Sequence, residues 1–134
     1  MATDRILLVD DDPDIRTIAS MALRAWGKFE VVSAESGEAA LEMALSANHD
    51  LLLMDVMMPR LDGIGVASEL RARGVIPNVP LIFLTAKAEP RDIELYLDLG
   101  AIGVIVKPFE PGHLAREARR LLGICRSVRL SVRR

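Results

Sequence analysis

The sequence has few aromatic residues, a single cysteine and little net charge. One cysteine, Cys125, excludes an internal disulfide and a cysteine metal cluster, which is typical of a reducing compartment. Aromatic residues make up 4% of the 134 residues, so aliphatic side chains and methionine must build the core. A net charge of −2 argues against a protein that binds nucleic acid by bulk charge.

Long apolar runs are also missing. No run approaches the roughly 18 residues of a membrane span. The apolar run that ends before Asp10 is too short for a signal peptide, so we expect a cytoplasmic protein with no membrane association. What is present is an apolar fraction of 51% with 27% charged residues, in a chain whose length suits one globular domain.

Short apolar runs alternate with segments of helical periodicity. The runs at 51–54 and 81–84 predict buried strands, and those at 6–9, 29–32 and 102–106 predict three further strands. Pro13 is suited to begin the first helix after an Asp12 cap, and Ser36 is suited to cap the second. This alternation predicts an α/β fold, a doubly wound five-stranded parallel sheet with five helices on its two faces.

Polar residues stand where four of these predicted strands end. Asp10 and Asp11 follow the first strand, Asp55 the third, Thr85 the fourth and Lys107 the fifth. Ligands of doubly wound sheets bind beyond the carboxyl ends of the strands, and in the order 2-1-3-4-5 the first and third strands are neighbours there. We therefore expect the three acids to converge.

Three carboxylates so close together need positive charge to stay ionised. An acidic site made of oxygen ligands favours a hard cation, and Mg²⁺ suits a few carboxylates with water and a phosphate. Lys107 adds an ammonium group and Thr85 a hydroxyl donor. The set predicts phosphoryl chemistry on a carboxylate nucleophile.

Four motifs in this order make the chain similar to a known family. They are Leu-Leu-Val-Asp-Asp-Asp at 7–12, Leu-Met-Asp-Val-Met-Met-Pro-Arg-Leu-Asp-Gly at 53–63, Leu-Thr-Ala at 84–86 and Lys-Pro-Phe at 107–109. With them the chain resembles a response-regulator receiver domain of the stand-alone, chemotaxis-regulator type. The resemblance implies a flavodoxin-like fold for a domain at 1–125.

The resemblance also implies a function in phosphorelay signal transduction. Asp55 would accept a phosphoryl group from a histidine kinase or a histidine phosphotransfer protein. Asp11, Asp55 and the main-chain carbonyl of Met57 would bind Mg²⁺, and Asp10 would help through water. Such a domain signals by binding a partner protein and is not an enzyme beyond its own phosphorylation and dephosphorylation.

The resemblance assigns the remaining site residues as well. Thr85 and Lys107 would contact the phosphoryl group. Apolar side chains would form part of the surface on which the kinase docks, namely those of Ile15, Ile18, Pro108 and Phe109.

One position departs from the pattern of the family. Receivers commonly carry an aromatic residue three positions before the lysine, and this chain has Val104 there. A valine cannot make the inward ring movement that accompanies activation in such domains. We therefore expect activation to be read out by loop movement or by a change in surface packing.

The same region is rich in apolar residues. Tyr96, Leu97, Ile102 and Val104 predict an apolar patch, and a patch of this kind often marks an interface. We expect a homodimer, or the docking of a partner protein, through this side. The alternative is that the fourth helix covers these residues.

The end of the chain, 126–134, is basic, and its arginines are Arg126, Arg129, Arg133 and Arg134. We expect a frayed tail and no output domain. The alternative is a continuation of the fifth helix with a basic face. His49 and His113 lack metal-ligand spacing and are expected at the surface.

Two other functions remain open on the sequence alone. One is a phosphohydrolase like the haloacid dehalogenase-type phosphatases, with Asp10 as nucleophile and Asp12 two residues on. Thr85 and Lys107 fit that reading, but a cap segment and a late acidic pair are not evident. The other is a degenerate receiver that binds partners without phosphorylation, which the valine at 104 keeps open.

Overall fold

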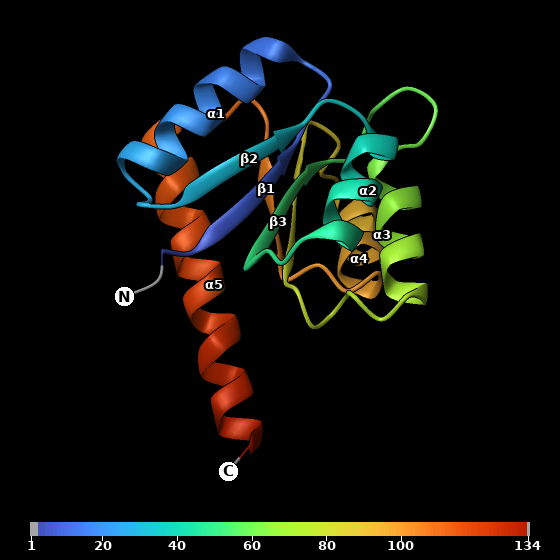
Figure 1. Ribbon diagram of the computed structural model, residues 1–134, viewed down its shortest axis with the longest axis vertical. Helices are drawn as coiled ribbons and strands as arrows, with labels where there is room; N and C mark the ends of the chain where they lie inside the picture. The colour runs from blue at the N-terminus through green and yellow to red at the C-terminus, as the bar shows by residue number, and fades with distance from the viewer. Residues whose placement is uncertain (1–2, 134) are drawn as a thin grey trace.

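The computed structural model describes residues 3–133, in which strands and helices alternate along the chain (Figure 1). The strands are β1 (Arg5–Val9), β2 (Glu30–Ala34), β3 (Leu51–Asp55), β4 (Leu81–Thr85) and β5 (Gly103–Val106). The helices are α1 (Pro13–Ala25), α2 (Gly37–Ser46), α3 (Gly63–Ala72), α4 (Pro90–Asp98) and α5 (Pro111–Arg133). The predicted alternation of five strands and five helices is confirmed for this part of the chain.

The strands form one parallel sheet in the order β2-β1-β3-β4-β5, as predicted. Val9 at the end of β1 pairs with Met54, one residue before Asp55. Thr85 at the end of β4 pairs with Val106 at the end of β5. The strand ends that carry the predicted site residues are therefore level with one another.

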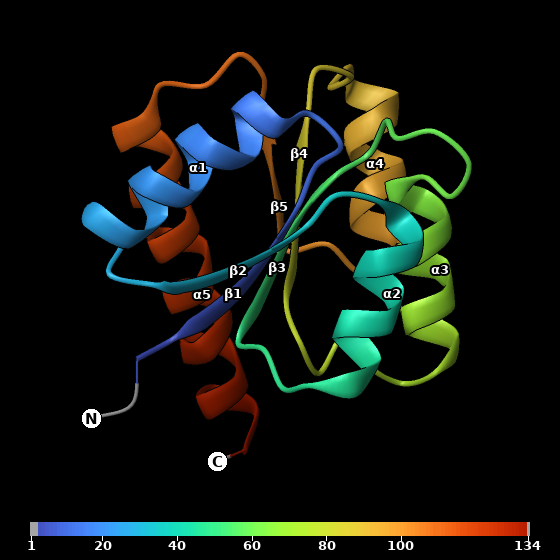
Figure 2. The same ribbon diagram turned by 45° about the horizontal axis from the view of Figure 1, so that its top comes forward.

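Helices cover both faces of the sheet. α1 and α5 lie on one face, and α2, α3 and α4 lie on the other (Figures 1 and 2). In β1, Leu7 and Val9 belong to the core beneath α2, α3 and α4, whereas Ile6 and Leu8 belong to the core beneath α1 and α5. The central strands β3 and β4 are buried at every residue and are apolar up to Asp55 and Thr85, whereas the edge strand β2 exposes Glu30 and Ser33.

The first two helices begin as their capping residues predict. The carboxylate of Asp12 accepts a hydrogen bond from Asp14 N–H at 2.9 Å, and Pro13 is the first residue of α1. The hydroxyl of Ser36 accepts one from Ala39 N–H at 3.1 Å. These contacts satisfy main-chain donors that have no partner inside the helix.

The predicted exposed apolar patch is wrong for Tyr96, whereas Leu97 is 48% exposed. Tyr96 is only 1% exposed and lies on the inner face of α4, where its ring packs against Phe83 with centroids 5.0 Å apart. Ile102 and Val104 are half-buried. Val104 packs against the core that contains Tyr96, whereas Ile102 packs against the core on the opposite face, beneath α1 and α5, so these side chains do not form one patch. That this side forms a homodimer stays a prediction.

The basic end of the chain also differs from the expected frayed tail, since α5 continues to Arg133. The guanidinium of Arg129 donates to the main-chain oxygens of Pro77 and Asn78, the latter at 2.9 Å, and so fastens this extension to the loop before β4. The side chains at 133 and 134 lie outside the described residues. Within 3–133, no helix is long and apolar enough to cross a membrane.

The two histidines differ from each other. His113 is exposed, as expected, but His49 is buried beside the start of β3, where burial lowers the pKa of its imidazole. Its position next to a buried strand, rather than any ligand spacing, explains the difference.

Candidate functional site

The three predicted acids meet at the carboxyl end of the sheet. Ligand oxygens of Asp10, Asp11 and Asp55 all lie within 4.8 Å of one another. Asp10 is fully buried and Asp55 is 5% exposed, whereas Asp11 is exposed to solvent. They converge because β1 and β3 are neighbours in the sheet, as the predicted strand order requires.

Lys107 reaches these acids from the end of β5. Its ammonium nitrogen lies 2.6 Å from Oδ2 of Asp10 and 3.3 Å from Oδ2 of Asp55. Its main-chain N–H donates to the carbonyl of Thr85 at 2.9 Å, which ties the ends of β4 and β5 together. Burial lowers the pKa of Lys107, but the hydrogen bond to Asp10 and the nearby carboxylate charges raise it more, so the group stays an ammonium.

One ammonium does not balance three carboxylates. Burial, and then the negative charge of Asp10, raise the pKa of Asp55, while Lys107 and the N–H of Met57 oppose that rise. The Met57 N–H donates to Oδ1 of Asp55 at 3.2 Å. The site is short of positive charge, and its oxygen donors fit a hard divalent cation such as Mg²⁺.

Both carboxylate oxygens of Asp10 and its main-chain oxygen already accept hydrogen bonds. One carboxylate oxygen accepts from Asp12 N–H at 3.0 Å, and the other accepts from Lys107. Arg16 donates to its main-chain oxygen at 2.8 Å. A nucleophile needs an accessible oxygen. The carboxylate of Asp12 is occupied as the cap of α1, where it accepts from Asp14 N–H. This geometry opposes the phosphohydrolase reading, in which Asp10 attacks and Asp12 assists.

Thr85 is fully buried, and its hydroxyl oxygen accepts a hydrogen bond from Lys87 N–H at 3.0 Å. The carbonyl of Lys87 in turn accepts from the hydroxyl of Tyr96 at 2.8 Å. Asp92 lies one turn before Tyr96 on α4 and approaches the Lys87 ammonium at 3.9 Å. Sequence reasoning missed both α4 residues in this role. Their spacing of four, which places two side chains on one helix face, was the available signal.

The loop after β3 explains the Asp62–Gly63 pair. A Cβ on Gly63 would clash with the main-chain oxygen of Asp55, so only glycine fits so close to the site. Asp62 caps α3 by accepting from Gly65 N–H at 2.8 Å. Met57 is exposed on the same loop, beside the acids.

Comparison with solved structures identifies close neighbours of this fold. The chemotaxis protein CheY4 of Vibrio cholerae superposes with a TM-score of 0.83 at 32% identity, covering 90% of this chain and 99% of that one. The receiver domain of the sensor histidine kinase PA1611 of Pseudomonas aeruginosa gives a TM-score of 0.80 at 35% identity, covering 91% and 99%. That receiver holds a magnesium ion coordinated in its active-site cleft.

Curated relatives are similar in sequence. A probable transcriptional regulator ycf27 of Porphyridium aerugineum is 41% identical over 91% of this chain and 49% of its own length. The alkaline phosphatase synthesis transcriptional regulatory protein PhoP of Bacillus subtilis is 39% identical over 88% of this chain and 48% of its own length. The chain spans about half the length of these relatives.

The family comparison agrees with the geometry. The family model of the response regulator receiver domain matches residues 6–119, which include every strand end described above. The fold, the acidic cluster and the lysine at the end of β5 all lie within that range. The chain therefore belongs to the response regulator receiver domain family.

Proposed function

We propose that Asp55 of this receiver domain accepts a phosphoryl group from a phosphohistidine on a histidine kinase or phosphotransfer protein. A carboxylate oxygen of Asp55 attacks the phosphorus, and a P–O bond forms as the P–N bond to the donor imidazole breaks. The electron pair stays on the imidazole nitrogen, which leaves as neutral imidazole when its other nitrogen is protonated. The carrying observation is the cluster of three carboxylates and one ammonium around Asp55.

Asp11, Asp55 and the main-chain carbonyl of Met57 would hold Mg²⁺, with Asp10 acting through water. The ion supplies the positive charge that an incoming phosphate needs beside three acids. The oxygen-only donor set and the closeness of the three carboxylates support this assignment. Asp10 itself positions the lysine, because the Lys107 ammonium lies closer to Asp10 than to Asp55.

Thr85 and Lys107 would contact the phosphoryl oxygens. The Lys107 ammonium is already within 3.3 Å of Asp55, so it can follow the new negative charge without a large movement. The Thr85 hydroxyl oxygen accepts from Lys87 N–H, and the hydroxyl proton could be donated to a phosphoryl oxygen. The exposed neighbours Met57 and Lys87 would influence how long the phosphoryl group lasts.

The domain would signal by binding a partner protein, and it would be an enzyme only toward its own phosphorylation and dephosphorylation. The donor would dock near the site on apolar side chains, those of Ile15, Ile18, Pro108 and Phe109; Ile18 and Pro108 are exposed. That the chain binds no nucleic acid and is cytoplasmic stays a prediction, which rests on its composition. The match to transcriptional regulators covers only half of those proteins.

Intact-mass spectrometry after incubation with acetyl phosphate and Mg²⁺ tests the proposal. The wild type should gain the mass of one phosphoryl group, and Asp55→Asn should gain none. Asp12→Asn is the matched control, because it changes a neighbouring acid to another good helix cap and should be labelled like the wild type. Labelling of Asp55→Asn would refute the assignment, and phosphoester turnover that Asp10→Ala abolishes would favour the phosphohydrolase. Sedimentation of the same samples reports any change in assembly.

A further inference from the structure

The chain lacks the usual aromatic residue in β5, but a buried aromatic residue lies nearby on α4. Tyr96 is the only tyrosine of the sequence and is 1% exposed. Its ring lies against Phe83 of β4, and its hydroxyl donates to the carbonyl of Lys87 at 2.8 Å. Burial is the main cause that raises the pKa of this phenol, so the group stays protonated and remains a donor.

Lys87 stands between this tyrosine and the site. Its main-chain N–H donates to the Thr85 hydroxyl at 3.0 Å, while its carbonyl accepts from Tyr96. Both polar groups of one residue are therefore fixed, one toward the acids and one toward α4. The backbone of Lys87 therefore links Thr85 to Tyr96 through two hydrogen bonds.

The side chain of Lys87 is held less firmly. Its ammonium lies 3.9 Å from Oδ1 of Asp92, and the Lys87 side chain is 59% exposed against 10% for Asp92. Asp92 is fixed by the N–H of Glu89, which donates to it at 3.2 Å in the first turn of α4. Lys87 also borders an open hollow of about 500 Å³ that Met57, Leu95 and Tyr96 help to line. The ammonium has room to leave Asp92.

We propose that Tyr96 positions the Thr85 hydroxyl through Lys87, and that phosphorylation of Asp55 is read out as a displacement of α4. This inference rests on the proposed function. New negative charge on Asp55 draws the Thr85 hydroxyl and the Lys87 ammonium toward it, and the Lys87 peptide moves with them. The Tyr96 hydroxyl is buried and cannot remain without a partner at low cost, so the ring and its helix follow.

This mechanism differs from a switch in which an aromatic side chain moves between an exposed and a buried position. Here the ring stays inside, and the helix that carries it shifts. The exposed face of α4, which includes Leu95 and Leu97, would present the change to a partner. A valine at 104 is compatible with this route, because β5 does not need to move a side chain.

Nuclear magnetic resonance of the full chain tests the inference with Tyr96→Phe, which removes one oxygen and keeps the ring. Glu94→Gln is the control, since it changes an exposed side chain on the same helix. In the absence of a phosphoryl donor, the main-chain amide proton of Lys87 should exchange with solvent faster in Tyr96→Phe than in the wild type. In Glu94→Gln its exchange rate should equal that of the wild type. Unchanged exchange in Tyr96→Phe would overturn the positioning role.

The second measurement compares chemical shifts before and after Asp55 is labelled, with Mg²⁺ and either fluoroberyllate or acetyl phosphate as the labelling reagent. In the wild type, the single tyrosine ring and the amides of 90–98 should shift when Asp55 is labelled. In Tyr96→Phe, labelling at Asp55 should persist while most of the α4 shifts disappear, and Glu94→Gln should behave like the wild type. A labelled wild type whose α4 does not respond, or a labelled Tyr96→Phe with undiminished α4 shifts, would overturn the inference alone. A wild type that takes no label would overturn the proposed function and this inference with it.

Discussion

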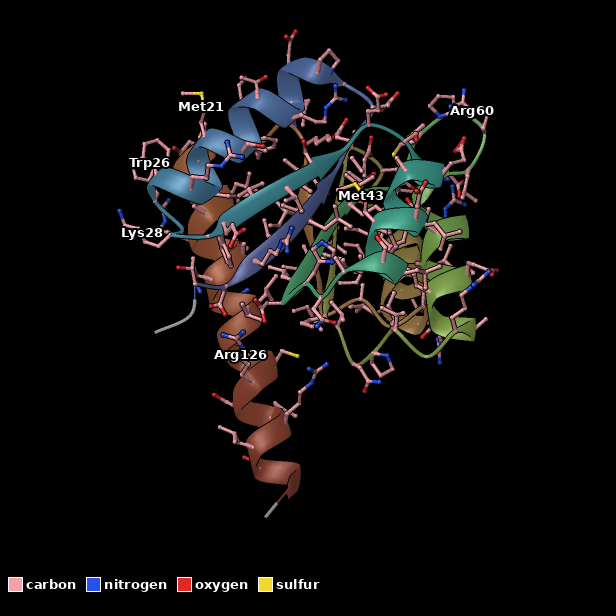
Figure 3. All side chains as sticks on the ribbon, viewed as in Figure 1. Met21, Trp26, Lys28, Met43, Arg60 and Arg126 are labelled. Atoms are coloured by element: carbon pink, nitrogen blue, oxygen red, sulfur yellow. The ribbon has the colours of Figure 1, made fainter. Side chains whose placement is uncertain are left out.

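The two ends of the sheet both gather acidic and basic side chains, but only one end balances them. Figure 3 shows Arg60 on the loop after β3 near the carboxyl end, and Arg126 on α5 at the opposite end of the molecule. At the carboxyl end, three carboxylates lie close together, and the ammonium of Lys107 contacts two of them, Asp10 and Asp55. At the amino end, the carboxylate of Asp4 is held by two guanidinium groups, those of Arg119 at 2.5 Å and Arg126 at 2.7 Å.

The pKa directions express the same difference. At the amino end, the hydrogen bond from Arg126, assisted by Arg119, lowers the pKa of Asp4 despite its partial burial. At the carboxyl end, burial and the charge of Asp10 raise the pKa of Asp55. A satisfied carboxylate serves the fold, whereas a carboxylate that lacks positive partners is ready for a cation and a phosphoryl group. Charge balance therefore separates the structural end from the functional end.

The largest effect is expected from removing the ammonium group that contacts both Asp10 and Asp55. Lys107→Met should lower the free energy of unfolding by about 3 kcal/mol in the absence of Mg²⁺, because it leaves buried carboxylates without a partner. It should also slow labelling of Asp55 strongly. Urea unfolding in EDTA and intact-mass kinetics measure the two effects. Wild-type stability in this variant would mean that Lys107 does not balance the acids.

Adding Mg²⁺ should produce the next largest effect. An ion that binds only the folded chain raises the free energy of unfolding by about 2.7 kcal/mol at 100 times its dissociation constant. Thermal unfolding should show this rise in the wild type. Asp11→Asn should lose most of it, and Arg126→Met, at the other end, should keep it. Equal stabilisation of Asp11→Asn and the wild type would contradict the assigned ion ligands.

A smaller effect on stability is expected at the amino end of the sheet, where Arg119 and Arg126 hold Asp4. Arg126→Met should lower the free energy of unfolding by no more than about 1 kcal/mol, because the guanidinium is partly exposed and Arg119 still holds Asp4. Labelling of Asp55 by acetyl phosphate should not change. Urea unfolding and mass spectrometry check both statements, and a loss of labelling would show that the two ends are coupled.

The smallest expected effect is on the pH dependence of stability, where Asp4 and Asp55 should change the free energy of unfolding in opposite directions. The lowered pKa of Asp4 gives stability that is present above its unfolded value and is lost as pH falls through the folded value. The raised pKa of Asp55 costs stability as pH rises from the unfolded value through the folded value. At neutral pH without Mg²⁺, Asp4→Asn should therefore be less stable than the wild type and Asp55→Asn more stable. Both differences should shrink in acid. Urea unfolding across this range measures them, and equal signs would contradict the comparison.

The strand ends were predictable from the sequence because their signals are local. Each apolar run is followed at once by its polar residue, as Asp55 follows Leu51–Met54 and Thr85 follows Leu81–Leu84. Parallel strands place such residues at one edge whatever the details of packing. The cap of α1 therefore needed no knowledge of distant contacts, whereas the convergence of the acids also required the strand order that makes β1 and β3 neighbours.

Other features depend on contacts that no local pattern records. Tyr96 looks like a surface residue in a helix of mixed character, but Phe83 and the Lys87 carbonyl offer it a buried place. The continuation of α5 depends on the carbonyls of Pro77 and Asn78, which lie about fifty residues earlier in the chain and accept from Arg129.

By itself, the sequence determined the α/β alternation and which side chains stand at the strand ends, since periodicity and neighbouring residues carry that information. The tertiary structure alone decided that Lys107 pairs first with Asp10, that Tyr96 turns inward and that α5 runs on past the sheet. Those outcomes depend on distances between residues far apart in the chain, which only the packed fold establishes.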